Sequence, residues 1–217
     1  TVSRFCVGYG RIKGFYAFEK GVKKGIDGEP IITIDDKSIK FIEDAQNGYI
    51  TIYKQTEEYI PYVIGADTSE GIEKDYHFVN VINNITSEQV ATLHSNKLDE
   101  DTLAEQLYCL GVDYNTALIT VEVNYSTHPQ KVLETLKYPK LYLRETMDNI
   151  GVNIVNKYGW KTTSATRPVI IAEMIAFSRE NINKINDIGL LEEMLTFVRN
   201  KNGRPEAEQG GTDDRVI

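Results

Sequence analysis

The feature that most constrains this sequence is a short apolar segment, residues 60–66, that ends at an aspartate. β-Branched and aromatic side chains dominate it, which is typical of a buried strand. Asp67 follows where the strand should leave the sheet, and Gly65 and Gly71 permit tight turns on either side. A carboxylate held there by a rigid backbone but facing an opening suits a metal site. A turn aspartate that closes a hairpin gives the same pattern, so Asp67 alone leaves both interpretations open.

From residue 61 onward the pattern predicts an α/β domain. Three strands over 61–67, 76–82 and 88–94 form an antiparallel meander. A helix from about residue 98 to Gly111 follows, and then a strand over 117–123. This order is that of the ribonuclease H-like fold, a central mixed sheet flanked by helices, in which the first and fourth strands are adjacent. Later elements are expected at 129–136 (helix), 141–143 (strand), 167–182 (long helix) and 189–198 (helix or strand).

Three further carboxylates are candidates to join Asp67. Glu122 interrupts the apolar strand, where an acid is costly unless it is paired or binds a metal, although alternation also permits a surface-facing glutamate. Asp213 and Asp214 follow a Gly-Gly bend, and either acid also fits as a helix cap. Converging carboxylates repel one another, and hard divalent cations relieve that repulsion. Two such ions about 3.5–4 Å apart can activate a water and stabilise the leaving oxygen of a phosphodiester.

The motifs and their order resemble the nuclease domain of the large terminase subunit of tailed bacteriophages. The similarity covers about residues 48–217, and five motifs occur in sequence, which is more specific than any single one. The first nuclease motif is residues 62–71 with 74–76, the second is 121–124 and the third is 211–214. Two further matching segments, 158–162 with Arg167-Pro168 and 190–197, lie between the second and the third. Thr212 stands where the family often has a histidine, and Ser126-Thr127-His128 where it often has a glycine.

The resemblance implies a metal-dependent endonuclease that cuts concatemeric viral DNA during packaging, with two Mg²⁺ or Mn²⁺ ions as cofactors. It implies that Asp67, Glu122 and Asp214 are the catalytic, metal-binding acids and that Asp213 is a further ligand. The residues expected around the metals are Asp75, Asn124 and Thr212. The DNA-binding candidates, each of which also fits an ordinary solvated surface, are Arg144, Lys157, Lys161, Thr162 and Arg167.

The resemblance also implies a larger assembly. Full-length family members carry an N-terminal ATPase motor, and no Gly-X4-Gly-Lys-Ser/Thr motif occurs here. We therefore expect residues 1–48 to be a lead-in or linker from the motor and residues 49–217 to be the nuclease domain, with its C-terminal helix truncated. The implied partners are double-stranded DNA, the motor, the small terminase subunit and the portal, in the cytoplasm of an infected bacterium. The domain itself is expected to be a monomer.

Composition restricts the alternatives. The net charge of −8 argues against a surface covered in positive charge for nucleic acid, but it fits an acidic site that awaits cations. No apolar run approaches membrane-spanning length, and no signal peptide is evident, so neither membrane insertion nor secretion is expected. Two alternatives remain: a Holliday-junction resolvase or ribonuclease of the same fold, and a non-catalytic module that docks DNA or the portal.

Overall fold

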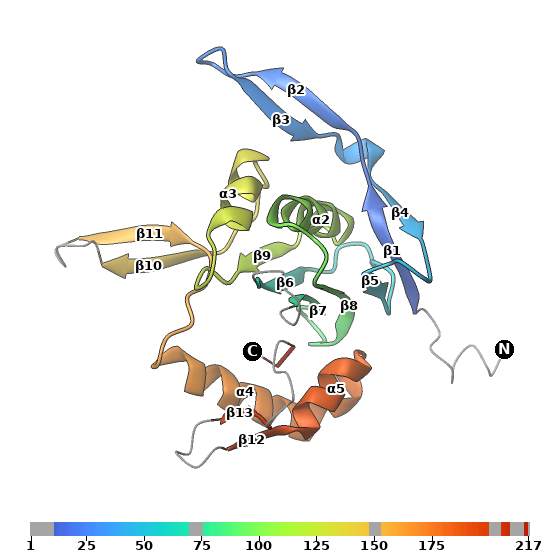
Figure 1. The fold of residues 1–217 in the computed structure, drawn as a ribbon, viewed down its shortest axis with the longest axis vertical. Helices are drawn as coiled ribbons and strands as arrows, with labels where there is room; N and C mark the ends of the chain where they lie inside the picture. The colour runs from blue at the N-terminus through green and yellow to red at the C-terminus, as the bar shows by residue number, and fades with distance from the viewer. Residues whose placement is uncertain (1–10, 70–75, 148–152, 200–204, 209–214, 217) are drawn as a thin grey trace.

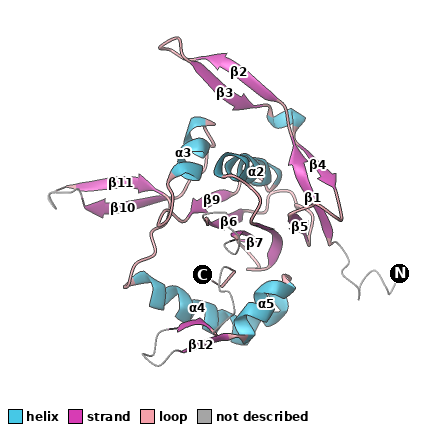
Figure 2. Ribbon diagram, viewed as in Figure 1, coloured by secondary structure: helices cyan, strands magenta, loops and turns pink. Residues whose placement is uncertain are grey.

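The computed structural model describes residues 11–69, 76–147, 153–199, 205–208 and 215–216. A seven-stranded mixed sheet lies at the centre (Figures 1 and 2). Helices α2 (Glu100–Asp113) and α3 (His128–Thr135) lie on one side of it, and α4 (Thr166–Asn181) and α5 (Ile188–Leu195) lie on the other. This layered arrangement is the predicted α/β architecture.

The strand order of the sheet is β4-β1-β5-β8-β7-β6-β9. Strands β6 (Tyr62–Asp67), β7 (His77–Asn83) and β8 (Gln89–Ser95) form the predicted antiparallel meander. Strand β9 (Leu118–Val121) pairs with β6 in parallel, so the predicted adjacency of the first and fourth strands is confirmed. Strand β5 (Ile50–Ile52) extends the sheet beyond β8.

The main core lies between the sheet and α2. Alternate residues of the central strands face this helix, and the most buried of them are fully enclosed. From the helix, Leu103, Leu107 and Leu110 are each 0% exposed and belong to this core. The helix begins at the cap Asp99, whose side chain accepts the N–H of Thr102 at 2.7 Å.

Residues before 49 also belong to the sheet. Strand β1 (Ile12–Ala17) pairs with β5 and with β4 (Lys40–Glu43), so the boundary expected at residue 49 falls between two strands of one sheet. Tyr16 is 3% exposed, and its backbone N–H and carbonyl both bond the side chain of Gln106 on α2. Strand β1 was not predicted, because it contains Gly14 and glycine weakens the strand pattern.

Three two-stranded hairpins complete the chain (Figure 1). Strands β2 (Lys20–Lys24) and β3 (Pro30–Ile34) form the first, which leads through the 3-10 turn η1 (Asp36–Ser38) into β4. The others pair β10 (Leu143–Met147) with β11 (Ile154–Tyr158), and β12 (Phe197–Arg199) with β13 (Pro205–Ala207). The short turn η2 (Ile182–Lys184) separates α4 from α5. Among the described helices, none is both long and apolar enough to cross a membrane.

Three predicted elements differ in their limits. Residues 189–198 contain all of α5 except its first residue and then the start of β12, and the strand expected at 141–143 begins only at Leu143 and continues to Met147. The helix predicted to end at Gly111 continues to Asp113, so that limit was wrong. The glycine is present because its neighbours leave no room for a side chain: an added Cβ would lie against the Tyr138 ring and 2.9 Å from Cδ1 of Ile119.

This close approach predicts the sign of a substitution. In an open helix Gly→Ala stabilises by about 1 kcal/mol, but overpacking a core costs about 1–3 kcal/mol. We therefore expect Gly111→Ala to lower the free energy of unfolding, measured by urea denaturation. In a Tyr138→Phe background, which removes the crowding hydroxyl, the same change should cost less. Stabilisation by Gly111→Ala in the wild-type background would contradict the packing explanation.

Candidate metal centre

Two predicted acids meet at the carboxyl ends of two parallel strands. Ala66 on β6 lies opposite Val121 on β9, and the N–H of Glu122 donates to the carbonyl of Ala66 at 2.8 Å. Asp67 and Glu122 are the next residues on the two strands, so both leave the sheet at the same edge. The predicted juxtaposition is confirmed, and the metal-binding role of the two residues stays a prediction.

Both acids line one cavity of about 260 Å³ on the face of the sheet that α4 covers. Each carboxylate residue is partly buried. Gly65, Asn80 and Thr120 line the sheet side, and Ile170 and Met174 of α4 lie across from them. Two carboxylates side by side in a partly dehydrated cavity form a hard oxygen donor set, which fits a divalent cation.

The segment after β9 forms a rim around this cavity. Trp160 bonds both sides of Glu122: its N–H donates to the carbonyl of Val121, and its carbonyl accepts the N–H of Val123, each at 2.8 Å. Asn124 bonds Thr162 twice, donating to its carbonyl at 2.5 Å and accepting its N–H at 2.8 Å. Asn124 thus fixes the loop between β11 and α4, which explains structurally why an asparagine follows Glu122 by two residues.

The segment after Asp67 is fixed through a buried histidine. The N–H of Ser69 donates to Nδ1 of His77 at 3.1 Å, so the proton of the neutral ring is on Nε2, which lies 3.1 Å from the carbonyl of Leu98. Burial lowers the pKa of His77, which is 1% exposed. Thr68 adds a bond from its hydroxyl to the carbonyl of Glu122 at 3.3 Å. These contacts hold the ends of β6 and β9 together.

Arg215 reaches the cavity from the end of the chain. Its backbone N–H donates to Oε2 of Glu193 at 2.8 Å, and its guanidinium lies 3.0 Å from Nδ1 of His94. Asp187, the cap of α5, lies 3.8 Å from its Nε. Gly189 makes room for the guanidinium, since a Cβ there would overlap it. The residue that follows Asp213 and Asp214 in sequence is therefore fixed between α5 and the sheet.

His94 provides a pH-dependent test of this contact. Burial, followed by the positive charge of Arg215, lowers the pKa of His94 from 6.5 to about 4. The unfolded chain therefore binds more protons than the folded chain between these values, and stability should fall as pH drops from 6.5 to about 4. Urea denaturation of wild type and His94→Gln across this range should show a steeper loss in the wild type. If the stability of the two proteins changes with pH in parallel, the lowered pKa of His94 in the folded protein is contradicted.

The other predicted site residues are distributed unevenly. Asp75, Thr212, Asp213 and Asp214 lie outside the described residues. Arg144 and Lys157 are opposite each other on the β10–β11 hairpin, and Arg144 donates to the carbonyl of Gly159 at 2.8 Å. Thr162 lines the metal-site cavity, and Arg167 lines a neighbouring cavity of about 480 Å³ with Asn124 and Thr162. Lys161 is exposed. The DNA-binding role of these five residues stays a prediction.

Sequence reasoning missed several residues that line the metal-site cavity. Trp160 falls in the matched segment 158–162 but was given no role at the metal site, and Asn80 on β7, Thr120 on β9 and Arg215 were not singled out. The available signal was alternation, since Asn80, Thr120 and Gly65 are polar or small positions within apolar strands and lie in one row across the sheet. No local pattern indicates Arg215, and the motif 158–162 does not show that Trp160 lines this cavity, because tertiary contacts bring both residues there.

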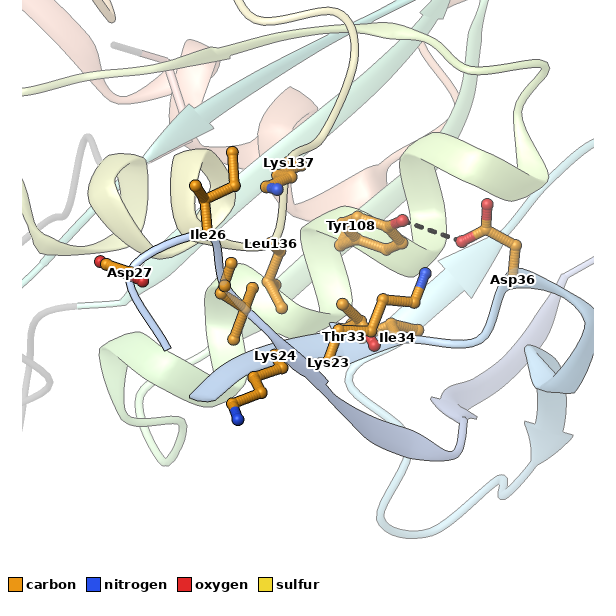
Figure 3. A pocket seen from close by; sticks show the side chains of 12 residues that line it. Lys23, Lys24, Ile26, Asp27, Thr33, Ile34, Asp36, Tyr108, Leu136 and Lys137 are labelled. Atoms are coloured by element: carbon orange, nitrogen blue, oxygen red, sulfur yellow. Dashed lines mark hydrogen bonds between the residues drawn. The ribbon is translucent and has the colours of Figure 1, made fainter. Parts of the chain in front are cut away.

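A larger cavity, about 710 Å³, lies elsewhere, between the β2–β3 hairpin and the α2–α3 side (Figure 3). Lys23, Lys24 and Lys137 line it together with Leu136. Asp27 and Asp36 also line it, and Asp36 accepts a hydrogen bond from the hydroxyl of Tyr108 at 2.9 Å. Because no pair of carboxylates from adjacent strand ends lines this cavity, size does not make it the metal site.

Comparison with solved structures identifies the fold. The nuclease of the large terminase from thermophilic phage G20c matches with a TM-score of 0.60 with bound magnesium and 0.56 with bound cobalt, at 18% and 20% identity. The nuclease domain of the Thermus phage P74-26 large terminase matches with a TM-score of 0.55 at 20% identity. Each match covers 79% of this chain, and between 82% and 85% of the other chain. No protein-family model matches the sequence. The predicted fold is therefore confirmed: the chain has the ribonuclease H-like fold of large terminase nuclease domains.

Proposed function

We propose that this chain is the metal-dependent endonuclease domain of a phage large terminase subunit and that it cuts double-stranded DNA during genome packaging. The observation that carries the proposal is the pair Asp67 and Glu122, which line one cavity at the ends of parallel strands in a fold shared with large terminase nucleases. The solved neighbours are terminase nucleases, which favours this function over a junction resolvase, a ribonuclease or a docking module.

Asp67 and Glu122 would hold divalent cations, either Mg²⁺ or Mn²⁺, and Asp213 and Asp214 complete the proposed ligand set. The phage G20c nuclease has been solved with magnesium and with cobalt, which supports a divalent cofactor here. Two bound cations supply Lewis acidity and countercharge for phosphodiester hydrolysis. The proposed sequence preference is low, because a site of this kind contacts the backbone of DNA and not its base edges.

The protein around the acids would orient the substrate and exclude water. Trp160 and Met174 enclose the cavity, which lowers the local dielectric around the carboxylates. Asn124 holds the Thr162 backbone at the rim, so the loop that meets the DNA is ordered before binding. The strand ends keep the spacing of Asp67 and Glu122 fixed, since backbone bonds join them directly.

The proposed partners are double-stranded DNA and, in the complete packaging machine, an ATPase motor, the small terminase subunit and the portal. The proposed location is the cytoplasm of the infected bacterium. Residues 1–48 would lead in from the motor, with the part described from residue 11 built into the nuclease sheet. We propose that the domain itself is a monomer. In the complete machine the motor would control when the domain meets DNA.

The experiment that tests the proposal combines binding and cleavage. Trp160 is the single tryptophan of the chain and lines the cavity, so its fluorescence reports on the site. We expect Mn²⁺ to quench this fluorescence and supercoiled plasmid to be cut with Mg²⁺ or Mn²⁺ but not with EDTA. Unchanged fluorescence together with uncut plasmid at every metal concentration would overturn the proposal.

A further inference from the structure

A second cavity continues from the metal centre along the same face of the sheet. We name it the β1 groove. Its volume is about 390 Å³, and the lining residues that matter here are Arg11, Lys13, Thr51, Thr92, His94 and Arg215. Arg215 also lines the cavity of Asp67 and Glu122, so the two cavities share a wall.

The floor of the two cavities is a single row across five strands. Lys13 on β1 lies opposite Thr51 on β5, and Thr51 lies opposite Thr92 on β8. The row continues through Asn80 on β7 to Gly65 on β6, two residues before Asp67. The side chains of the threonines and the asparagine in this row are small and polar, and the glycine has none. The row therefore places the β1 groove and the metal centre on one face of the sheet, with Asp187 over Thr92 and Arg215 over His94 between them.

The row also sets the length of the path. Neighbouring strands lie about 4.8 Å apart, so four steps from β6 to β1 span about 19 Å. Figure 1 shows this succession of strands from β6 toward the edge formed by β1 and β4. Along one strand of duplex DNA the rise is about 3.4 Å per nucleotide. The groove therefore lies about 19 Å across the sheet from the metal centre, which corresponds to about five or six nucleotides of duplex.

The charge of the groove is opposite to that of the whole chain, which carries −8. Arg11 and Lys13 are exposed, and within the described residues no ion pair joins either one to a carboxylate. Arg11 instead donates to the carbonyl of Asn186 at 3.3 Å and lies over the Tyr53 ring, 5.8 Å from its centroid. These two contacts hold the guanidinium beside the groove.

The carboxylate in the groove, Asp187, already has hydrogen-bond donors within the protein. Asp187 accepts the hydroxyl of Tyr53 at 2.8 Å and the N–H of Leu190 at 2.7 Å. Its Oδ1 also lies 3.8 Å from Nε of Arg215. The groove therefore presents the two side-chain cations, Arg11 and Lys13, to an incoming anion, while its carboxylate is used inside the protein. The lowered pKa of His94, to which the charge of Lys13 also contributes, is consistent with this positive environment.

We propose that the β1 groove binds backbone phosphates of the DNA on one side of the cut, with Arg11 and Lys13 as the contacting residues. The inference rests on the proposed endonuclease function and adds the surface that the substrate follows. It differs from the set predicted from sequence, which lies around β10, β11 and the start of α4. The ligand class is a phosphodiester chain, because the groove shares Arg215 with the cavity of a site for which a phosphodiester is the proposed substrate.

The test compares two charge-matched variants. Arg11→Gln/Lys13→Gln removes the proposed contacts, and Lys131→Gln/Lys140→Gln removes two exposed charges on the α3 side. Both are made in an Asp67→Asn background to prevent cutting, and binding to a fluorescent duplex of about 30 base pairs is followed by anisotropy at several salt concentrations. Circular dichroism checks that each variant is folded, and single Lys13→Gln replaces the double variant if the latter is not.

Each phosphate contact contributes about −0.9 to the slope of log K against log salt. We expect Arg11→Gln/Lys13→Gln to reduce the magnitude of that slope by about 1.8 and to weaken binding roughly ten- to a hundredfold near 0.1 M salt, with the single variant losing about half of the slope change. The α3-side variant should match the parent. Equal slopes for the two double variants would overturn the inference.

Two further outcomes have distinct meanings. If the wild type cuts plasmid with Mn²⁺ but the groove variant binds DNA like its control, the inference fails and the proposed function stands. If the wild type neither binds nor cuts DNA, both fail. Millimolar inorganic phosphate at constant ionic strength should not displace the duplex, because single phosphates lack the multiple contacts; displacement would identify a small-anion site and overturn the DNA assignment.

Discussion

Replacing Asp67 by asparagine is expected to reduce metal-dependent DNA cleavage by about a thousandfold or more. The amide has nearly the same shape but no charge, so it cannot offset a divalent cation, and metal catalysis accounts for several kcal/mol of barrier lowering. The effect should be severe because Asp67 and Glu122 line one cavity and are proposed to hold the cations together. Initial rates of plasmid nicking with Mn²⁺, at equal protein concentration, measure it.

The control for this change is Asp101→Asn. Asp101 is an exposed aspartate on α2, with a side chain that is 67% exposed, and it lies on the other side of the sheet from the metal centre. We expect wild-type cleavage from it. Mn²⁺ quenching of Trp160 fluorescence should weaken in Asp67→Asn and stay unchanged in Asp101→Asn. Wild-type cleavage by a folded Asp67→Asn protein would refute the assignment of Asp67 to the metal centre.

The largest effect on stability is expected from Leu107→Ala. Leu107 is 0% exposed and belongs to the cluster between α2 and the sheet. Deleting such a side chain removes buried apolar area and leaves a cavity, which costs about 2–5 kcal/mol. For a chain of this size each kcal/mol lowers Tm by about 2–4 °C. Thermal unfolding followed by circular dichroism should show the shift.

Leu195→Ala is the matched control, since Leu195 ends α5 and is 85% exposed. Its free energy of unfolding should change by no more than about 0.5 kcal/mol. Because α2 lies on the face of the sheet away from the metal centre, Leu107→Ala should keep its cleavage activity at temperatures well below its lowered Tm. Equal stability losses for the two variants would show that the core lies elsewhere.

The meander and its acidic strand end were predictable because the signals are local. Alternating apolar residues define β6, β7 and β8, and the helix cap and inner face define α2. The element order is that of the ribonuclease H-like fold, whose layout predicted β9 beside β6 and therefore Glu122 beside Asp67. Gly111 shows the limit of local reasoning, because a glycine kept for close packing resembles one that ends a helix.

The edge of the sheet was not predictable in the same way. Strand β1 contains Lys13 and Gly14, which weaken its alternation, and its place beside β5 depends on pairing with residues about forty positions away. The burial of β1 depends on Gln106, which is ninety residues from Tyr16 in the sequence. The side chain of Gln106 forms hydrogen bonds with the backbone N–H and carbonyl of Tyr16. Long-range pairs of this kind leave no periodic trace in either segment.

The sequence by itself indicated the fold class and the meeting of Asp67 with Glu122, because the order of its elements is that of the ribonuclease H-like fold, in which the first and fourth strands are adjacent. Only the tertiary structure decided what surrounds those acids. The ring of Trp160, the guanidinium of Arg215 and the charges of Arg11 and Lys13 reach this face from separate parts of the chain. The physical reason is that side-chain packing and charge pairing act through space, whereas a sequence pattern records only neighbours along the chain.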